Sequence, residues 1–299
     1  MTGGVRISVA IATCGRPEAL RICLAAMAGQ SRAPEQLIIV DQDPRAETRD
    51  VIEQSGLPIT HLEQARRGLS ASRNLALSAA KGDVLAVTDD DCFPDARWVE
   101  SLIDGFGSEP APDAVTGPVL PPPGDAPKDM RALALRLSRE TKLFSARVIP
   151  WQVGSGPNFA ARVDVLRGIS GWDERLGVGT PGMAGEDIDI VDRLLAANRS
   201  ILYNGRAVMH HAWQTRDRRR ATRWSYGYGI GALSGLRLGE RDPYGWRMLA
   251  SYSKMHLREL LRETARGDWT SVRERTTSLS ALVPSFIYGL RAAGHDRRR

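Results

Sequence analysis

The 299-residue sequence contains no apolar run that approaches the roughly 20 residues of a membrane-spanning helix. No signal peptide is visible, because Met1 leads into a short polar stretch and then a strand-like segment. Cysteine is scarce: Cys14, Cys23 and Cys92 cannot all pair, and their spacing matches no zinc motif. These absences predict a cytoplasmic protein with reduced thiols. Whether it also binds peripherally to the inner face of a membrane stays open.

Charge is distributed unevenly along the chain. The hydrophobic content of 42% and charged content of 25% are ordinary for a globular protein. However, residues 1–203 contain 22 Lys+Arg and 27 Asp+Glu, whereas residues 204–299 contain 19 and 8. The last third therefore requires solvent or an acidic partner, and phosphates, anionic lipid headgroups and nucleic acid all qualify.

Strand-like and helix-like segments alternate over the first 90 residues. The expected strands span 7–12, 36–40, 59–62 and 83–88, and the expected helices span 17–27, 45–54 and 68–80. This alternation with short loops predicts an α/β fold with a doubly wound, mostly parallel sheet. All four strands end in polar loops, so we expect polar side chains to gather at one edge of the sheet.

The pattern beyond residue 91 is less regular. Helices are expected over 98–106, 130–144 and 186–198, short strands over 114–119, 201–203 and 207–209, and a loop over 121–127. Three further helices are expected over 217–238, 245–266 and 270–290. Pro284 within the last of them predicts a kink.

The apolar strand that ends at Thr88 runs directly into Asp89, Asp90 and Asp91. Three adjacent carboxylates repel one another, and a divalent cation would relieve that repulsion. Hard oxygen ligands suit Mg²⁺ or Mn²⁺, usually completed by substrate phosphates. A solvated acidic turn is the simpler alternative for such a triplet. The buried strand before it favours the metal site, since ligands of open α/β sheets bind at the carboxyl ends of strands.

Other polar residues follow the neighbouring elements. Asp41 and Asp43 end the second strand, where an Asp often accepts hydrogen bonds from a nucleoside, although turn formation is the simpler explanation for this pair taken alone. Arg66 and Arg67 precede the helix that starts near Gly68. Arg73 falls in the first turns of that helix, where it can reach a phosphate, a base or a nearby Asp; an ordinary surface charge is the alternative.

A glycine-rich loop leads into Glu186 and Asp187, which open a helix. Acidic residues in a first helical turn are favoured by the helix dipole, and this alone explains them. A carboxylate held at a helix start is also well placed to act as a general base. His210 and His211 follow a later strand and are candidates for the same edge.

Five of these segments, in this order, resemble the motifs of the family 2 glycosyltransferases with the GT-A fold. They are Thr13–Pro17, Ile39–Asp43, Gly68–Asn74, Asp89–Asp91 and Gly185–Asp189. The resemblance covers about residues 5–215. It implies a Rossmann-like sheet, a nucleotide-sugar donor (a UDP-, GDP- or dTDP-sugar), Mn²⁺ or Mg²⁺, and inverting transfer to an acceptor hydroxyl.

The resemblance also implies roles for the donor and metal residues. The donor-binding assignments are Thr13, Cys14, Gly15, Arg16, Asp41, Asp43, Arg73, Asp89 and Asp90. Asp41 is expected to contact the base and Arg73 to support the nucleotide pocket. Asp91 is expected nearer the metal and Asp89 nearer the ribose. His210 or His211 is expected to complete the metal shell, and the sequence does not choose between them.

On the acceptor side, the resemblance implies that Asp187 is the general base and Glu186 its neighbour in the motif. Trp172, Asn158 and Gly185 are expected to bind the acceptor. The Q-x-x-R-W motif of processive synthases is absent, because no Gln stands at the required spacing before Arg223–Trp224. We therefore expect transfer of one sugar rather than polymerisation.

The expected organisation is a catalytic domain over 1–212 and a basic helical extension over 213–299. The first is expected to divide into a donor-binding part, 1–119, and an acceptor-binding part, 120–212. The extension ends in an amphipathic stripe of Leu279, Leu282, Val283, Phe286, Ile287 and Leu290, followed by Arg297–Arg299. Two interpretations stay open: packing on the catalytic domain or on a second subunit in a homodimer, or peripheral contact with an anionic membrane.

Two other functions are compatible with parts of the sequence. A sugar nucleotidyltransferase also binds nucleotides on an α/β sheet, but no Gly-rich loop with the required basic residues follows the first strand. A non-catalytic basic protein could bind nucleic acid or lipid through the last third, but the acidic motifs would then have no purpose. We therefore expect a nucleotide-sugar and an acceptor as partners, and no nucleic acid.

Overall fold

The computed structural model describes residues 4–65 and 67–296, so Arg66 and Arg297–Arg299 lie outside the described residues. The chain divides into two compact units. The first comprises 1–172 and 190–214, and the second comprises 173–189 and 215–299. Residues 173–189 thus group with the C-terminal helices rather than with the expected catalytic domain. The expected split of that domain at residue 119 stays a prediction.

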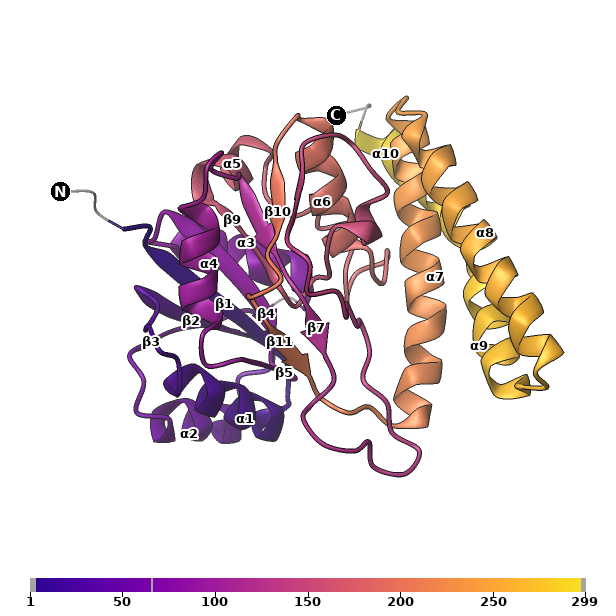
Figure 1. Cartoon of the computed structure of the whole chain (residues 1–299). Helices are drawn as coiled ribbons and strands as arrows, with labels where there is room; N and C mark the ends of the chain where they lie inside the picture. The colour runs from indigo at the N-terminus through magenta and orange to yellow at the C-terminus, as the bar shows by residue number, and fades with distance from the viewer. Residues whose placement is uncertain (1–3, 66, 297–299) are drawn as a thin grey trace. The chain divides into compact units, whose positions relative to one another are not determined.

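The first unit is built on an eight-stranded sheet in the order β3-β2-β1-β4-β9-β6-β10-β8 (Figure 1). In chain order its strands are β1 (Ile7–Thr13), β2 (Gln36–Asp41), β3 (Ile59–Glu63), β4 (Val84–Asp89), β6 (Ala114–Thr116), β8 (Lys142–Phe144), β9 (Phe159–Arg162) and β10 (Ile201–Tyr203). The strands β1 to β4 pair in parallel, as predicted. β9 runs antiparallel to both β4 and β6, so the sheet is mostly rather than wholly parallel.

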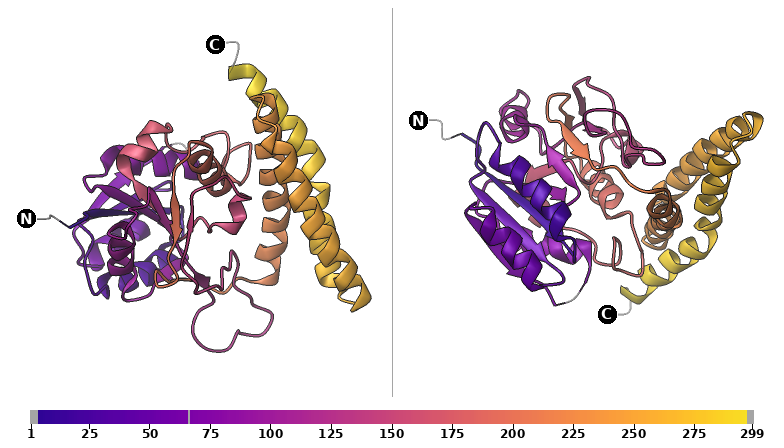
Figure 2. Two further views of the ribbon diagram at one scale, coloured as in Figure 1. Left: turned by 45° about the horizontal axis from the view of Figure 1, so that its top comes forward. Right: turned by 90° about the horizontal axis from the view of Figure 1, so that it is seen from below.

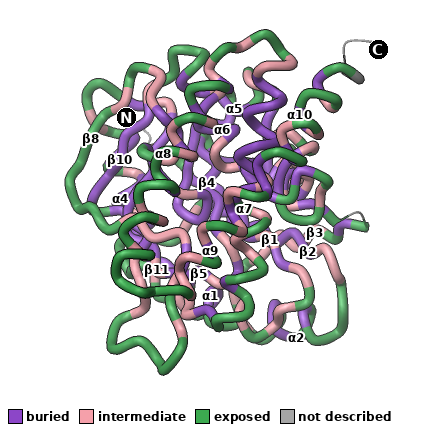
Figure 3. The backbone as a smooth tube through the Cα atoms, turned by 90° about the vertical axis from the view of Figure 1, so that its right-hand side faces the viewer, coloured by how far each residue is buried: buried purple, intermediate pink, exposed green. Residues whose placement is uncertain are grey.

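Helices cover both faces of this sheet (Figure 2). One face packs against α1 (Pro17–Ala28), α2 (Ala46–Gln54) and α4 (Trp98–Phe106); the other packs against α3 (Leu69–Ala79), α5 (Val163–Gly168) and the part of α6 (Glu186–Ala196) from Ile190 onward. Within β1, Val9 and Ile11 enter one hydrophobic cluster and Ala10 the other. β4 is buried except at its last residue (Figure 3). Two-sided burial explains why the interiors of β1, β2 and β4 carry no charged residue.

A second, three-stranded sheet joins distant parts of the first unit. Its order is β5 (Cys92–Pro94), β11 (Met209–His211) and β7 (Val119–Leu120). The expected strand at 207–209 therefore lies two residues later than predicted. This sheet fixes the segment after the Asp triplet against the segment that carries the two histidines.

The expected helix over 130–144 is wrong. Asp129 and Ala134 have φ values of 62° and 55°, which a right-handed helix does not accommodate. The segment instead forms isolated bridges, pairing Arg131 with Gln214 and Arg136 with Val119. The Arg136 guanidinium also donates to the backbone carbonyls of Trp151 and Gly154. Long-range pairing therefore overrides the local helical spacing here.

The second unit consists mainly of helices. They are α7 (Arg216–Gly239), α8 (Tyr244–Ala265), α9 (Trp269–Ser280) and α10 (Leu282–Asp296). The last helix expected from the sequence is thus two, separated at Ala281. Pro284 lies in the first turn of α10, where its missing N–H removes no helical hydrogen bond. Within the part of the chain that the structure describes, no helix combines the length and apolarity required to cross a bilayer.

Two glycines bring α7 and α10 into backbone contact. A Cβ added at Gly235 of α7 would lie 2.3 Å from the carbonyl oxygen of Phe286. One added at Gly289 of α10 would lie 2.1 Å from the carbonyl oxygen of Ala232. Neither position tolerates a side chain unless the helices move apart.

Candidate active site

The carboxyl ends of β1 and β4 meet, because the two strands pair in parallel with Ala12 opposite Asp89. Asp90, the next residue, is fully buried. Its carboxylate accepts a hydrogen bond of 2.8 Å from Thr13 Oγ1 and forms an ion pair with Arg16. Burial raises the pKa of Asp90 to about 7; Asp91 and Asp89 act in the same direction, while Arg16 and Thr13 oppose the rise. Asp90 therefore ties the loop after β1 to the triplet.

Arg16 also contacts the third carboxylate. Its Nη1 lies 2.9 Å from Asp91 Oδ2, which is 3.3 Å from Gln214 Nε2. Burial acts to lower the pKa of Arg16, but Asp90, Asp91 and Asp89 outweigh burial and raise it. Arg16 is thus a counter-ion shared within the triplet. Gln214 was not predicted here, and its position depends on chain pairing that a local motif does not reveal.

The first carboxylate faces α3. Arg73 is only 4% exposed, and its Nη2 lies 3.3 Å from Asp89 Oδ1. Of the interpretations open for Arg73, contact with a nearby Asp is the one that the structure contains. The triplet is therefore partly neutralised from two sides, by Arg16 after β1 and by Arg73 from α3.

The two histidines differ in their surroundings. His211 is opposite Cys92 in the small sheet, and its Nε2 lies 3.9 Å from Asp91 Oδ1. His210 instead stacks on Phe93 with ring centroids 5.7 Å apart, and its Nδ1 lies 2.8 Å from the carbonyl oxygen of Pro121. Successive side chains of a strand point to opposite faces, so only one of the two reaches the triplet. That residue is His211.

The residues at this edge suit a hard divalent cation. One ligand atom each from Asp91, Cys92 and His211 fall within 4.8 Å of one another. Burial, followed by the nearby carboxylates, raises the pKa of the Cys92 thiol, and soft sulfur is in any case a poor match for a hard cation such as Mn²⁺ or Mg²⁺. A carboxylate and an imidazole remain, which is a donor set that Mn²⁺ accepts when phosphate oxygens supply further ligands.

The end of β2 lies beside the end of β1, with Asp41 opposite Thr13. Asp41 is fully buried, and its Oδ1 accepts a 2.9 Å hydrogen bond from the Asp43 backbone N–H, so the predicted turn is present. Its Oδ2 has no hydrogen-bond partner among the described residues, and the imidazole Nε2 of His61 lies 3.7 Å away. Buried acceptors are normally hydrogen-bonded, so an N–H group of a ligand could donate to this oxygen.

The remaining donor-side residues lie in the loops around these strand ends. Asp43 forms ion pairs with Arg45 at 2.8 Å and Arg67 at 3.3 Å. Gly15 has a φ of 61°, and a Cβ there would lie 3.0 Å from Asp43 Oδ2. Cys14, which directly follows β1, is half-buried. The structure thus gathers Thr13, Arg16, Asp41, Arg73 and the Asp triplet at one edge, with Gly15 and Asp43 adjoining it.

Two acceptor assignments need correction, because both side chains are buried structural residues. Asn158 accepts from Trp98 Nε1 at 2.9 Å and donates to the carbonyls of Pro118 and Ala207 at 2.9 and 2.7 Å. Trp172 is 2% exposed and packs edge-on against Phe159. Neither presents a surface that a sugar could contact. Their burial depends on contacts with distant segments, which a local motif does not reveal.

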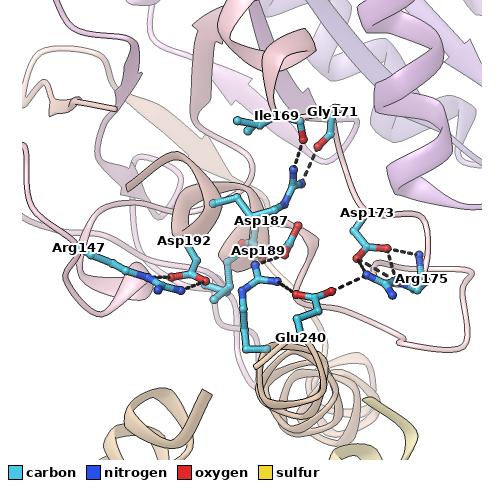
Figure 4. A network of polar contacts seen from close by, with 12 residues as sticks. Arg147, Ile169, Gly171, Asp173, Arg175, Asp187, Asp189, Asp192 and Glu240 are labelled. Carbon is cyan, nitrogen blue, oxygen red and sulfur yellow. Dashed lines mark hydrogen bonds and ion pairs between the residues drawn. The ribbon is translucent and has the colours of Figure 1, made fainter. Parts of the chain in front are cut away.

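In the second unit, the carboxylates of the first turn of α6 differ in exposure. Glu186 and Asp189 are buried, and Asp189 Oδ1 lies 2.5 Å from Arg237 Nη2 (Figure 4). Asp187 is intermediate in exposure, and its Oδ1 accepts from the Ile188 backbone N–H. Gly185 has a φ of 89°, and a Cβ there would lie 3.0 Å from the carbonyl oxygen of Gly229. Close packing on α7 accounts for this glycine without an acceptor.

Similarity to known proteins agrees with this geometry. Residues 8–169 match the family model described as glycosyl transferase family 2. A glucosyl-dolichyl phosphate glucuronosyltransferase of Haloferax volcanii is 24% identical over 219 residues, which cover 69% of each chain. A pre-mycofactocin glycosyltransferase of Mycobacterium tuberculosis is 30% identical over 155 residues, covering 51% of this chain and 32% of that protein.

Solved structures share the fold. A mannosyltransferase from Pyrobaculum calidifontis, in complex with GDP-Man and Mn²⁺, aligns with a TM-score of 0.60 at 15% identity, covering 97% of this chain and 88% of that one. TarS 1–349 of S. aureus aligns with a TM-score of 0.56, also at 15% identity, covering 98% and 91%. Together with the mostly parallel sheet, these likenesses confirm the predicted GT-A fold.

Proposed function

The chain belongs to glycosyl transferase family 2, and on that premise we propose that it moves one sugar from a nucleotide-sugar to an acceptor hydroxyl, with inversion and with the help of a divalent cation. The premise makes the protein a glycosyltransferase and replaces the nucleotidyltransferase and non-catalytic alternatives. One observation carries the finer proposal: Arg16, Arg73 and His211 converge on the carboxylates that end β4.

Under this proposal the first unit binds the donor. The unpaired Oδ2 of Asp41 accepts a hydrogen bond from the base, and Asp89 accepts one from the ribose. Thr13 and Asp90 fix the loop after β1, so that Arg16 is held beside the diphosphate. Because Arg16 already bridges two carboxylates, it is positioned before the donor arrives and loses little conformational entropy on binding.

Asp91 and His211 are the residues that would hold the metal. When bound, a divalent cation stabilises the negative charge on the departing diphosphate. Arg16 supplies a fixed positive charge beside the same oxygens, which favours the charge-separated transition state over the ground state. None of Asp91, His211 and Arg16 has to form a covalent bond with the sugar.

We assign the general base to Asp187. Inversion requires one carboxylate that takes the proton of the attacking hydroxyl, and this carboxylate must reach solvent-borne acceptors. Of the carboxylates in the first turn of α6, Asp187 alone is half-exposed, since Glu186 and Asp189 are buried. Glu186 is therefore assigned to orientation of that turn rather than to proton transfer.

Calorimetric titration with UDP, GDP and dTDP, each with and without Mn²⁺, tests the donor side. Metal-dependent binding of one nucleoside diphosphate is expected, and it should be lost in Asp91→Asn but kept in the surface control Asp50→Asn. A screen of sugars on the preferred nucleotide then identifies the donor by mass spectrometry of the product. If no nucleoside diphosphate binds under any condition, the donor assignment fails.

Asp187→Asn tests the acceptor side separately. This variant should bind donor and metal normally but lose at least about a hundredfold in transfer rate, as expected when a general base is removed. The anomeric configuration of the wild-type product, measured by NMR, should be opposite to that of the donor. Retention of configuration, or normal transfer by the variant, would contradict the proposed mechanism.

A further inference from the structure

Helix α8 packs through one face. Its buried residues are Gly245, Met248, Tyr252 and His256, which follow one another at intervals of three or four. Tyr252 also bonds to Ser278 of α9 at 2.6 Å, so this face is fixed within the second unit. The opposite face of α8 is directed to solvent.

That outer face carries a row of apolar side chains. Trp246, Leu257 and Leu261 are 58%, 53% and 65% exposed, and the exposed Ala250 stands between them. At roughly 100° per residue these four positions lie within about 60° of one another on the helix. Trp246 contacts Phe286 of α10 with ring centroids 5.5 Å apart. An apolar strip therefore runs along α8 and reaches α10.

Exposed side chains of α10 extend the strip. Val283 and Ile287 are 68% and 43% exposed and flank Phe286 in the sequence. Burying apolar side chains such as these away from water is favourable by about 25 cal/mol for each Å² of apolar surface. A continuous run of them on one unit indicates a surface that something covers.

A row of cations borders the apolar row. Arg247, Lys254 and Arg258 are exposed and follow at i, i+7 and i+11, about 80–120° around the helix from Trp246. Over the ranges 4–65 and 67–296, none of the three has a recorded ion pair with a carboxylate; Arg247 lies over the ring of Tyr244. By contrast, the neighbouring Arg262 is paired with Glu259 at 2.7 Å. The three positive charges of the row therefore stay uncompensated.

We propose that this outer face of α8, with the adjoining exposed residues of α10, docks on an anionic lipid bilayer. The row of Trp246, Leu257 and Leu261 would enter the boundary between headgroups and acyl chains, and the cations would lie among the phosphates. An apolar row beside a basic row on a single helix is the arrangement that interfacial helices use. The contact is peripheral and does not depend on the reaction.

Charge decides between a bilayer and a second copy of the chain. In a two-fold dimer the same patch meets itself, so Arg247, Lys254 and Arg258 would face their own copies without intervening acids. The apolar row argues against nucleic acid, because a phosphate backbone binds the cations but leaves exposed leucines such as Leu257 and Leu261 in water. Anionic lipid satisfies both rows at once.

Flotation of the full chain with vesicles, in the absence of any substrate, tests the proposal. Binding is expected to vesicles of phosphatidylcholine mixed with phosphatidylglycerol, and not to phosphatidylcholine alone. It should weaken as salt is raised, because exposed charges are screened beyond about 10 Å at 0.1 M salt. Two variant sets then separate the two rows.

The first set, Leu257→Gln with Leu261→Gln, should reduce binding at least about tenfold through loss of apolar contact. The second set neutralises the basic row with Arg247→Gln, Lys254→Gln and Arg258→Gln. It should reduce binding on the order of a hundredfold, since each cation near an anionic surface contributes about a factor of five. All five positions are exposed, so the fold should persist, which circular dichroism checks.

Matched controls lie in the first unit. Leu137→Gln removes another exposed leucine, and Arg32→Gln, Arg199→Gln and Arg206→Gln remove three exposed cations. Neither control should change vesicle binding. Equal binding to neutral vesicles, no binding to anionic ones, or equal loss in both variant sets and both controls would overturn the proposal. So would a lipid-free dimer, seen by light scattering, that the α8 substitutions dissociate.

Failure here is separable from failure of the proposed reaction. The α8 variants should retain metal-dependent nucleotide binding, because the donor residues all belong to the first unit. A chain that binds nucleotide but no vesicle keeps its proposed function and loses only this surface.

Discussion

Arg237 of α7 and Asp189 of α6 form a buried ion pair, with 2.5 Å between Nη2 and Oδ1. The same guanidinium donates from Nη1 to Glu240 at 3.2 Å, and Glu240 in turn contacts Arg175 at 3.0 Å. Arg175 is also paired with Asp173 (Figure 4). This chain of charges fixes the first turn of α6, and with it Asp187, to the helices of the second unit.

Arg237→Met should destabilise the second unit, because it removes the guanidinium that is paired with the buried carboxylate of Asp189. Removal of one member of a buried pair typically costs about 3–5 kcal/mol. Urea unfolding followed by tryptophan fluorescence should show the earlier transition, together with loss of transfer activity. Arg220→Met, an exposed position on the same helix, is the control and should leave both unchanged. A wild-type unfolding profile for Arg237→Met would show that the pair contributes no stability.

His211→Ala and His210→Ala should differ in their response to metal. His211 lies near Asp91, whereas His210 is stacked on Phe93 and contacts the Pro121 carbonyl. His211→Ala is expected to raise the Mn²⁺ concentration for half-maximal nucleotide binding at least about tenfold. His210→Ala should leave it within about twofold and act on stability instead. A titration in which the two variants exchange these behaviours would refute the assignment of His211.

Asn158→Ala should affect stability rather than acceptor affinity. The substitution leaves Trp98 Nε1 and the carbonyl of Ala207 without their partner inside the core, whereas the Pro118 carbonyl keeps the Met209 backbone N–H. Each unpaired buried group costs about 1–3 kcal/mol, so the melting temperature should fall markedly. In the fraction that stays folded, the KM for acceptor should match the wild type. A raised KM with an unchanged melting temperature would restore the original acceptor assignment.

The stability of the second unit should decrease on acidification because of His256. This residue is 4% exposed and packs on Tyr252 with ring centroids 4.2 Å apart. Burial, followed by Arg275 and Arg223, lowers the pKa of His256 from 6.5 to about 4. The unfolded chain therefore binds a proton more readily than the folded one between these values. The free energy of unfolding is therefore unaffected by protonation of His256 above pH 6.5. It decreases as the pH falls from 6.5 toward 4, by up to about 3 kcal/mol.

Unfolding midpoints measured at pH 7 and pH 5 should reveal this dependence. His256→Phe keeps an aromatic ring against Tyr252 but cannot take up a proton, so its midpoint should fall less between the two pH values. The Nδ1 of His256 has no hydrogen-bond partner among the described residues, so replacing the imidazole with a phenyl ring removes no hydrogen bond at Nδ1. An identical slope in variant and wild type would assign the acid sensitivity to other groups.

The sheet core was predictable from sequence because burial on both faces leaves a direct record in the residues. Runs such as Ile7–Ala12 and Val84–Thr88 are uninterrupted by charge, and the intervening helices have apolar stripes. Residues 130–144 have helical spacing too, yet Asp129 and Ala134 have positive φ and the segment pairs with distant strands. Local periodicity carries no information about such partners.

The site was predictable to the extent that it depends on strand ends. Parallel pairing aligns Thr13 with Asp41 and Ala12 with Asp89, so residues that follow these strands meet whatever the loops do. The choice of His211 depends instead on the pairing of β11 with β5, more than a hundred residues away in sequence. Likewise, the burial of Trp172 depends on neighbours that its own segment does not reveal.

The backbone contact between α7 and α10 limits which face of α10 can carry large side chains. Where Gly289 meets Ala232 there is no space for any side chain between the two helices. The β-branched residues Val283 and Ile287 of α10 lie away from this contact and are exposed. Val283 and Ile287 contact water because α10 packs on α7 through its opposite face. A bulkier residue at position 289 would push α10 away from α7, and the exposed side chains of α10 would move with it.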